Sequence, residues 1–396
     1  MTDPGHLSTA EAARRLGVKP ETVYAYVSRG LLTSVRRPGH RGSAFAVDQV
    51  EALAARGRAG RSPRGALERI RTSVTALDDD RLYYRGRPVT DLVGSGYESV
   101  AELLWLARPG PRAWPPPEAA TVRAVSAAMG SLPPAARPAD RVRAGVTVLA
   151  ALDPGRSDLR PEAVVPAART MIPALAAALA GAAGRGHRTV ADLLWRALGP
   201  RSPAPGDVAV LDAALVLLAD HGLAASTLAA RVAASVRADV HGVVSAGLGA
   251  ADGPLHAAAP EQARRLLDAA VVDPGAALAP YLRDRSPPPG FGHAVYRRRD
   301  PRADALLDLL PDGPAVAAAD ALGARLASRE DLFPTVDLAL AALTRTYGMR
   351  PGAGQLVFQL ARIAGWVAHA LEEYAEPGVR FRAVGVYTGA LPGHRP

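Results

Sequence analysis

The sequence of 396 residues is 48% hydrophobic and contains no cysteine. The lack of cysteine excludes disulfides, thiolate metal sites and a cysteine nucleophile, and it suits a reducing, cytoplasmic compartment. The formal net charge of +9 is concentrated near the N-terminus, because residues 1–64 carry 11 Lys and Arg against 5 Asp and Glu. This end of the chain therefore has the charge expected for nucleic-acid binding.

Length and apolar composition predict two or three domains built mainly from helices. Alanine is the dominant apolar residue, whereas Val, Ile, Phe and Tyr are too sparse for a sheet-rich protein. Residues 1–5 (Met-Thr-Asp-Pro-Gly) lack the basic and apolar regions of a secretory signal peptide. The most apolar stretch, residues 171–183, contains Pro173, and we expect it to be too short to cross a bilayer.

Two short helices, each followed by glycine, are predicted within the first thirty residues. Ser8 and Glu11 have the spacing of a capping box, so a helix should run over residues 9–16. Pro20 suits the first position of a second helix, which should continue over residues 21–29. Two helices joined by a tight turn form a helix-turn-helix pattern.

A basic loop and a third helix follow this pattern. Residues 36–43 (Arg-Arg-Pro-Gly-His-Arg-Gly-Ser) form a hairpin-like loop, and Asp48 should cap a helix that runs through Leu53. With residues 10–24, this order resembles the winged DNA-binding domains of the MerR and excisionase type, whose second helix enters the major groove while the wing touches the backbone. The resemblance implies two sets of DNA contacts, with Thr22, Tyr24, Tyr26 and Arg29 facing DNA and Arg36, Arg37 and Arg41 contacting phosphates.

The alternative for this segment is a small helical module used for dimer contacts, its arginines merely solvated. Residues 54–63 read as a linker rich in Gly and Arg. The sequence therefore predicts a winged helix-turn-helix domain over residues 1–64 and a second region over residues 65–396.

Three short segments in the C-terminal half each present one ionisable side chain. They are residues 253–256 (Gly-Pro-Leu-His), 290–296 (Gly-Phe-Gly-His-Ala-Val-Tyr) and 334–337 (Pro-Thr-Val-Asp). Two imidazoles and a carboxylate suffice to remove a proton from carbon beside a thioester and to pass the resulting carbanion to a ketone.

Further segments accompany these three in a fixed order. A polar hairpin over residues 72–86 leads into a helix over residues 97–104. Later come residues 221–231, the Asp-Pro-Arg at 300–302, and two segments at 361–369 and 380–389. In this order the segments resemble citrate synthase, over residues from about 70 to 389.

The resemblance implies a mainly α-helical citrate synthase fold with large and small helical domains, the small one at roughly 230–350 and closing over the cleft. It implies acetyl-CoA and oxaloacetate as substrates, and no cofactor beyond acetyl-CoA as co-substrate. Because the site borrows an arginine from a partner subunit, it also implies a homodimer or a higher even oligomer. No membrane partner is expected, and DNA is a further partner through residues 1–64.

The chemistry requires both a base and hydrogen-bond donors. The methyl group of acetyl-CoA is a far weaker acid than a carboxyl group, so a carboxylate can deprotonate it only while a donor stabilises the charge that develops on the thioester oxygen. By resemblance, Asp337 is the base and His256 is that donor. His293 then polarises and protonates the ketone oxygen of oxaloacetate, and hydrolysis of the citryl thioester releases CoA.

Oxaloacetate carries two carboxylates, which guanidinium groups match in bidentate geometry. By resemblance, Arg302 and Arg362 bind them, with His221 on the same substrate. A third arginine is expected from the tail of the partner subunit, either Arg382 or, in the alternative alignment, Arg380.

Several positions depart from the family pattern. The family usually follows its first histidine with glycine and then asparagine, whereas His256 is followed by Ala-Ala-Ala-Pro at residues 257–260. Alanine adopts a positive φ less readily than glycine, which leaves CoA binding and acyl choice open. Ala224 and Thr335 also stand where the family often has asparagine.

Two rival functions remain. One is a 2-methylcitrate synthase that takes propionyl-CoA. The other is a transcription regulator whose citrate synthase fold only senses acyl-CoA or oxaloacetate. Retention of the two histidines, the aspartate and the arginines argues against a pure sensor. No metal-binding constellation is predicted.

Overall fold

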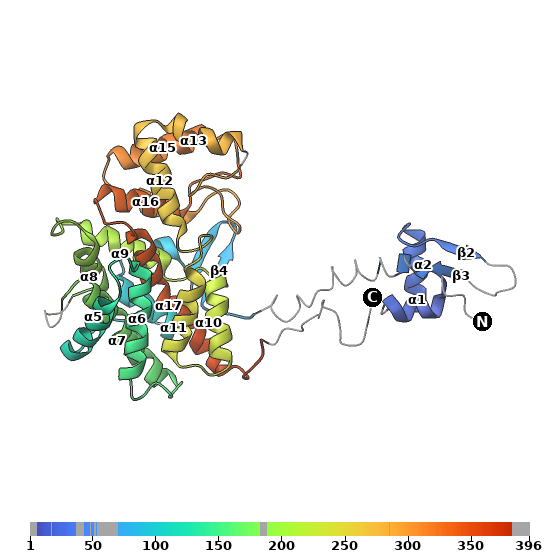
Figure 1. Ribbon diagram of the computed structural model, residues 1–396, viewed down its shortest axis with the longest axis horizontal. Helices are drawn as coiled ribbons and strands as arrows, with labels where there is room; N and C mark the ends of the chain where they lie inside the picture. The colour runs from blue at the N-terminus through green and yellow to red at the C-terminus, as the bar shows by residue number, and fades with distance from the viewer. Residues whose placement is uncertain are drawn as a thin grey trace. The chain divides into compact units, whose positions relative to one another are not determined.

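The computed structural model describes residues 6–16, 18–36, 43–47, 49–50, 53, 70–182, 188–284 and 286–381. The chain divides into two compact units (Figure 1). One comprises Met1–Arg71 together with Phe381–Pro396, and the other comprises Thr72–Arg380.

Among its described residues, the small unit has two complete helices and a three-stranded antiparallel sheet in the order β1-β3-β2. The helix expected from Asp48 through Leu53 lies largely outside the described residues. The predicted helix starts are confirmed: Ser8 and Glu11 form the reciprocal bonds of a capping box, and Pro20 stands at the start of the second helix. The elements are β1 (His6–Ser8), α1 (Thr9–Leu16), α2 (Pro20–Ser28), β2 (Ser34–Arg36) and β3 (Ser43–Ala46).

A small hydrophobic core holds this unit together. Val23 of α2 and Phe45 of β3 are fully buried in it, with Leu32 from the segment between them. Tyr26 packs against the same core, whereas Tyr24 is 52% exposed. Residues two apart on a helix point about 200° apart, so these two tyrosines cannot share one face.

The large unit begins with an antiparallel hairpin, as predicted. Strands β4 (Thr75–Asp78) and β5 (Arg81–Tyr84) pair so that Asp78 faces Arg81 across a two-residue turn. A third short strand, β6 (Arg87–Pro88), extends this sheet. A 3-10 turn, η1 (Val89–Leu92), then leads into α4 (Tyr97–Leu106).

Most of the large unit is a helical lobe around one central helix. The buried helix α17 (Ala353–Ala375) packs against α4, α6, α7, α9, α10 and α11. Small residues allow these close contacts, because a Cβ on Gly247 would lie 2.6 Å from the Trp366 ring. The other helices are α5 (Ala119–Ser131), α6 (Pro138–Leu152), α7 (Pro161–Leu179), α8 (Val190–Leu198), α9 (Asp207–Leu218), α10 (Ala225–Ser235) and α11 (Val240–Ala251).

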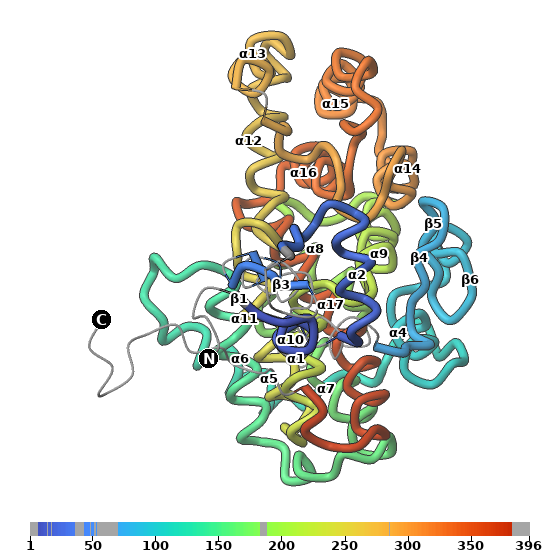
Figure 2. The backbone as a smooth tube through the Cα atoms, turned by 90° about the vertical axis from the view of Figure 1, so that its right-hand side faces the viewer, coloured from blue at the N-terminus to red at the C-terminus, as the bar shows by residue number. Residues whose placement is uncertain are grey.

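A smaller lobe stands at one end of this unit in both Figure 1 and Figure 2. Its helices pack mainly on one another, and α14 and α16 also reach α9 and α17. The segment expected for a small domain, residues 230–350, also takes in α11, which packs with α6 and α17 in the larger lobe. The smaller lobe consists of α12 (Ala259–Val272), α13 (Pro274–Arg283), α14 (Pro301–Leu307), α15 (Pro314–Leu326) and α16 (Val336–Thr346).

Helix α7 is longer than the sequence suggested. It begins at Pro161 and continues through Pro166 and Pro173 to reach 19 residues, so by length and composition alone it could cross a membrane. Of its apolar window, 56% is buried inside this protein, where α7 packs against α5, α8 and α17.

Candidate active site

Six of the predicted site residues come from six different segments of the chain, three of them helices and three of them connections between helices. His221 lies between α9 and α10, His256 between α11 and α12, and His293 between α13 and α14. The other three are helical: Arg302 in the first turn of α14, Asp337 in the first turn of α16, and Arg362 in the middle of α17.

Tyr296 joins several of these side chains. Its hydroxyl lies 3.0 Å from Nε2 of His221, and its ring centre lies 4.8 Å from that of His293. The two histidine rings are 5.2 Å apart. The Arg302 guanidinium lies 5.3 Å from the Tyr296 ring centre, in a cation–π arrangement.

Both candidate catalytic histidines are neutral at pH 7. Burial lowers the pKa of His256 to about 4, with help from Arg362. Burial likewise lowers the pKa of His293 to about 4, and Arg302 adds to the effect. Neutral imidazoles can donate one N–H while their second nitrogen accepts a hydrogen bond.

The local contacts assign the proton on each ring. Nδ1 of His293 accepts the backbone N–H of Val295 at 3.0 Å, so the ring proton is on Nε2. Nε2 of His256 lies 2.8 Å from the Ser226 hydroxyl. Trp366 donates its indole N–H to the same oxygen, and His256 is the one acceptor found for the Ser226 hydroxyl hydrogen among the described residues. We therefore infer that Ser226 donates to His256, which leaves the proton on Nδ1.

Asp300 couples Arg302 to the start of α16. Its carboxylate oxygens accept hydrogen bonds from Nε and Nη2 of Arg302, at 2.9 and 2.8 Å. It also accepts the N–H of Val336 at 3.0 Å, directly before Asp337. Asp300 therefore fixes both the guanidinium and the first turn of the helix that bears the candidate base.

Arg362 is buried with most of its hydrogen-bonding capacity unused. Its Nε donates to the carbonyl of Leu218 at 2.8 Å, and its guanidinium lies 4.5 Å from the Phe358 ring centre. Nη1 and Nη2 have no hydrogen-bond partner among the described residues. A buried unpaired charge is unfavourable, so these nitrogens are available to an anion.

The carboxyl group of Asp337 titrates well above its usual range. Burial raises its pKa to about 6, and the nearby Asp300 adds to this, while Arg302 and Arg362 oppose it. A carboxylate with a raised pKa is a stronger base than an ordinary one.

Comparison with known proteins identifies the family of this chain. A family model described as the C-terminal domain of citrate synthase matches residues 66–382. The chain belongs to the citrate synthase family. It is 28% identical to citrate synthase 2 of Bacillus subtilis over 76% of this chain and 89% of the relative. It is 30% identical to 2-methylcitrate synthase 2 of Corynebacterium glutamicum over 79% of this chain and 90% of the relative.

Solved citrate synthases have the same fold. The enzyme from Thermotoga maritima aligns with a TM-score of 0.67 at 25% identity, covering 83% of this chain and 95% of that one. A ternary complex of the Thermoplasma acidophilum enzyme with carboxymethyl coenzyme A and oxaloacetate aligns with a TM-score of 0.67 at 24% identity, covering 83% and 96%.

Of the two arginines expected from the tail, the structure describes Arg380 but not Arg382. Nε and Nη2 of Arg380 donate to the two carboxylate oxygens of Glu373, at 2.6 Å each. Arg380 is thus engaged in its own subunit, whereas Arg382 lies outside the described residues.

Glu373 belongs to a buried ionic cluster that also holds the start of the large unit. Fully buried Arg231 contacts Glu373 and Glu372. Glu372 in turn accepts the backbone N–H and hydroxyl of Ser73 at 2.7 and 2.9 Å. Nη1 of Arg231 lies 2.8 Å from Nδ1 of His369, and Nε2 of His369 lies 3.3 Å from the Asp220 carboxylate. The cluster thus extends to Asp220, which directly precedes His221 in the chain.

The residues expected to contact DNA are partly described. Thr22 is partly buried, and Tyr24 and Arg29 are exposed on or next to α2. Tyr26 is partly buried and packs against the small core. The backbone of Arg36 pairs with Ser43 in the β2–β3 hairpin. Arg37 and Arg41 lie outside the described residues.

The alanine-rich loop after His256 does not adopt the positive φ that favours glycine. None of residues 257–260 has a positive φ. The loop turns because N–H groups of His256 and Ala257 bond to the carbonyls of Gly253 and Ala251. Alanine is therefore compatible with this loop, and Ala257 is fully buried.

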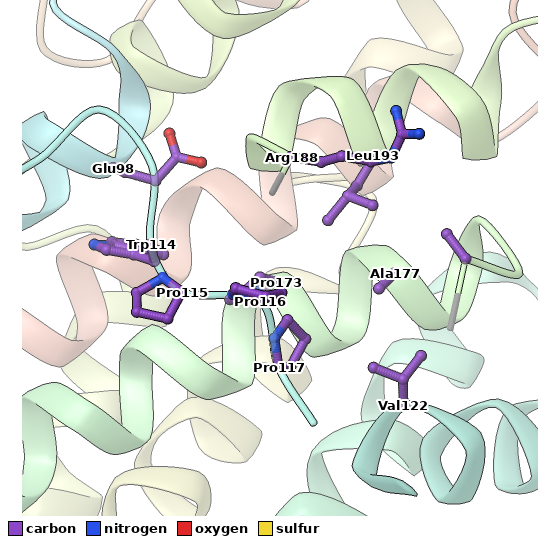
Figure 3. Close-up of a pocket in the computed structure, with 11 residues that line it drawn as sticks. Glu98, Trp114, Pro115, Pro116, Pro117, Val122, Pro173, Ala177, Arg188 and Leu193 are labelled. Atoms are coloured by element: carbon purple, nitrogen blue, oxygen red, sulfur yellow. The ribbon is translucent and has the colours of Figure 1, made fainter. Parts of the chain in front are cut away.

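Sequence reasoning missed Tyr296, Ser226 and Asp300 as members of the site. Tyr296 and Asp300 stand in segments that were singled out, but only the fold shows which groups they contact. A cavity of about 30 Å³ lies elsewhere, between Glu98, Trp114 and the helix α7 that carries Pro173 (Figure 3). None of the predicted site residues lines this cavity, and it is too small for a substrate.

Proposed function

We propose that this protein condenses acetyl-CoA with oxaloacetate and hydrolyses the resulting citryl-CoA to citrate and CoA. The observation that carries the proposal is the grouping of a carboxyl group with raised pKa, two neutral imidazoles of defined protonation and a buried arginine with two free nitrogens. These groups supply a base, two neutral donors and an anion site, as this reaction requires.

In the first step, the Asp337 carboxylate takes a proton from the methyl group of acetyl-CoA. The Nδ1–H of His256 donates to the thioester oxygen, where negative charge develops. In the second step, the enolate carbon attacks the ketone carbon of oxaloacetate. The Nε2–H of His293 donates to the ketone oxygen and passes it the proton that makes the product hydroxyl group. Asp337 then releases the methyl proton to water, and His293 takes one proton back from water. Water then cleaves the thioester, releasing CoA and citrate.

Oxaloacetate is bound through its two carboxylates in this proposal. Arg362 offers Nη1 and Nη2, and Arg302 presents its remaining nitrogen beside Tyr296. His221, whose pKa burial lowers well below its usual range, acts as a neutral hydrogen-bonding partner. The solved complex of the Thermoplasma acidophilum enzyme with oxaloacetate and a CoA analogue supports this substrate pair.

We further propose a homodimer in which Arg382 of one subunit completes the site of the other. The pairing of Arg380 with Glu373 favours Arg382 over the alternative arginine. The dimer also supplies the second copy of any DNA-binding head.

The test is release of free CoA from acetyl-CoA and oxaloacetate, followed with a thiol reagent. The protein contains no cysteine, so it adds no background. Turnover that is lost in Asp337→Ala, with folding retained by circular dichroism, would support the synthase. Folded protein that binds either substrate without turnover with acetyl- or propionyl-CoA would instead favour the sensor.

A 2-methylcitrate synthase is the second candidate within the family. Relatives of that name from Corynebacterium glutamicum and Mycobacterium tuberculosis are 30% and 29% identical to this chain. The ratio of kcat/KM for propionyl-CoA to that for acetyl-CoA decides between the two. A ratio above one would transfer the proposal to 2-methylcitrate synthesis.

We also propose that residues 1–64 form a DNA-binding head. Two helices, an antiparallel hairpin and the exposed side chains of Tyr24 and Arg29 support it. The family match begins at residue 66, which fits a boundary near residue 64. The test is the salt dependence of binding of the full chain to duplex DNA. Arg36→Ala, at an expected phosphate contact, should lower the slope of log K against log salt by about 0.9, and an unchanged slope would argue for the helical dimer module.

A further inference from the structure

The turn of the β4–β5 hairpin reaches the segment that follows His293. Asp79 and Asp80 form this two-residue turn, with φ of 42° and 57°. A turn with positive φ at both central positions matches the twist of a hairpin, and aspartate tolerates it. The hairpin belongs to the larger lobe, whereas the His293 segment leads into α14 of the smaller lobe.

The Asp80 carboxylate binds two consecutive backbone groups of that segment. One oxygen accepts the N–H of Arg297 at 2.6 Å, and the other accepts the N–H of Arg298 at 3.0 Å. The Asp80 side chain is only 8% exposed. The N–H of Arg297 is the main cause that lowers the pKa of this carboxyl group, so it is ionised at neutral pH.

The bound segment carries Tyr296, the residue that joins the substrate-binding groups. Tyr296 directly precedes Arg297, bonds to His221, and lies between His293 and Arg302. His293 also accepts the N–H of Val295, so residues 293–298 follow one defined path. A shift of this path would move Tyr296, and with it the groups that Tyr296 contacts.

We propose that Asp80 is a positioning residue that latches the hairpin of the larger lobe onto the His293 segment of the smaller lobe and so aligns His293 and Arg302 with oxaloacetate. This inference rests on the proposed function, because it assigns that substrate to those residues. The latch acts mainly through the two backbone N–H groups, and the side chain of Arg298 adds an ion pair, with its Nε 3.7 Å from the Asp80 carboxylate.

Asp79 offers a matched control one residue away. Its side chain is 79% exposed and pairs only with the exposed guanidinium of Arg298 at 3.0 Å. Glycine adopts positive φ without strain, so Asp80→Gly and Asp79→Gly each remove a carboxylate and leave the turn unstrained. Asp80→Asn keeps one acceptor oxygen and serves as the conservative variant.

The experiment measures steady-state kinetics and amide hydrogen exchange for the three variants of the full chain. Asp80→Gly should lower kcat/KM for oxaloacetate by roughly ten- to a hundredfold, as misplacement of reacting groups does. Its KM for acetyl-CoA should change less. Asp79→Gly should stay within about twofold of the parent, since exposed ion pairs contribute little, and Asp80→Asn should fall between the two.

Hydrogen exchange over residues 294–298 separates this inference from the proposed function. Faster exchange in Asp80→Gly than in Asp79→Gly would support the latch even if the parent protein releases no CoA, in which case the proposed function alone fails. Equal exchange in the two variants, or equal kcat/KM in an active enzyme, would overturn the latch. If Asp80→Gly does not fold, Asp80→Asn is judged by the same two measurements.

Discussion

Arg362 is a buried cation whose Nη1 and Nη2 have no partner among the residues that the structure describes. Leaving a buried polar group unpaired costs about 1–3 kcal/mol. Arg362→Met should therefore stabilise the ligand-free protein by up to roughly this amount, while oxaloacetate should no longer raise the melting temperature. Thermal unfolding with and without oxaloacetate measures both effects. A destabilised variant that still responds to oxaloacetate would show that Arg362 is structural.

Asp337 links activity to pH through its pKa of about 6. As the base it must be ionised, so kcat/KM should rise with pH through about 6. The same shift affects stability in the opposite sense, because a carboxyl group whose pKa is raised on folding stabilises the native state at low pH and loses this contribution as pH rises through 6. Asp337→Asn should abolish turnover and raise stability at pH 8 by up to about 3 kcal/mol, but not at pH 4. Equal melting temperatures of the two proteins at pH 8 would contradict this account.

At the scale of single residues, sequence motifs predict some members of the site and not others. His256, His293 and Asp337 stand in short segments whose neighbours identify them. Tyr296 and Asp80 also stand in segments that the sequence singles out, but their roles depend on contacts between segments far apart in the chain. Asp80 lies 217 positions from its bonding partner Arg297, and no local pattern reports that contact.

At the scale of helices, the packing of α11 against α17 depends on one glycine. A Cβ on Gly247 would lie 2.6 Å from the Trp366 ring, whereas a Cβ on Gly249 would meet nothing within 4 Å. Gly247→Ala should destabilise the protein by about 1–3 kcal/mol through overpacking. Gly249→Ala should stabilise it by up to about 1 kcal/mol through helix propensity. Urea unfolding of both variants tests this, and equal effects at the two positions would refute it.

Helix starts were easier to predict than helix extents or lobe boundaries. The capping box at Ser8 and the proline at Pro20 identify where α1 and α2 begin. Helix α7 contains both Pro166 and Pro173, although proline normally interrupts a helix, so its extent does not follow from its sequence. The smaller lobe could not be delimited, since alanine-rich helices on either side of residue 255 have similar sequences.

At the scale of the whole molecule, the proposed exchange of Arg382 between subunits can be tested by complementation. Asp337→Asn and Arg382→Ala should each be inactive alone, because each lacks one part of every site. A mixed dimer would contain one complete site, so co-refolding equal amounts should restore about a quarter of the parent activity per subunit. Independent inactive subunits would restore none, which would place the third arginine elsewhere.

The two ends of the large unit are held by neighbouring residues of α17. Ser73 is bonded to Glu372, and Arg380 to Glu373, so both connections to the small unit leave from the same place. Adjacent ends make the order of segments dispensable for the fold. A short peptide joining residues 380 and 72, with new ends opened in the exposed loop at 154–157, would give a circular permutant that retains the contacts among the described site residues but lacks Arg382. Because both connections leave the large unit beside Glu372 and Glu373, a whole domain can be attached there without altering the contacts between the two lobes.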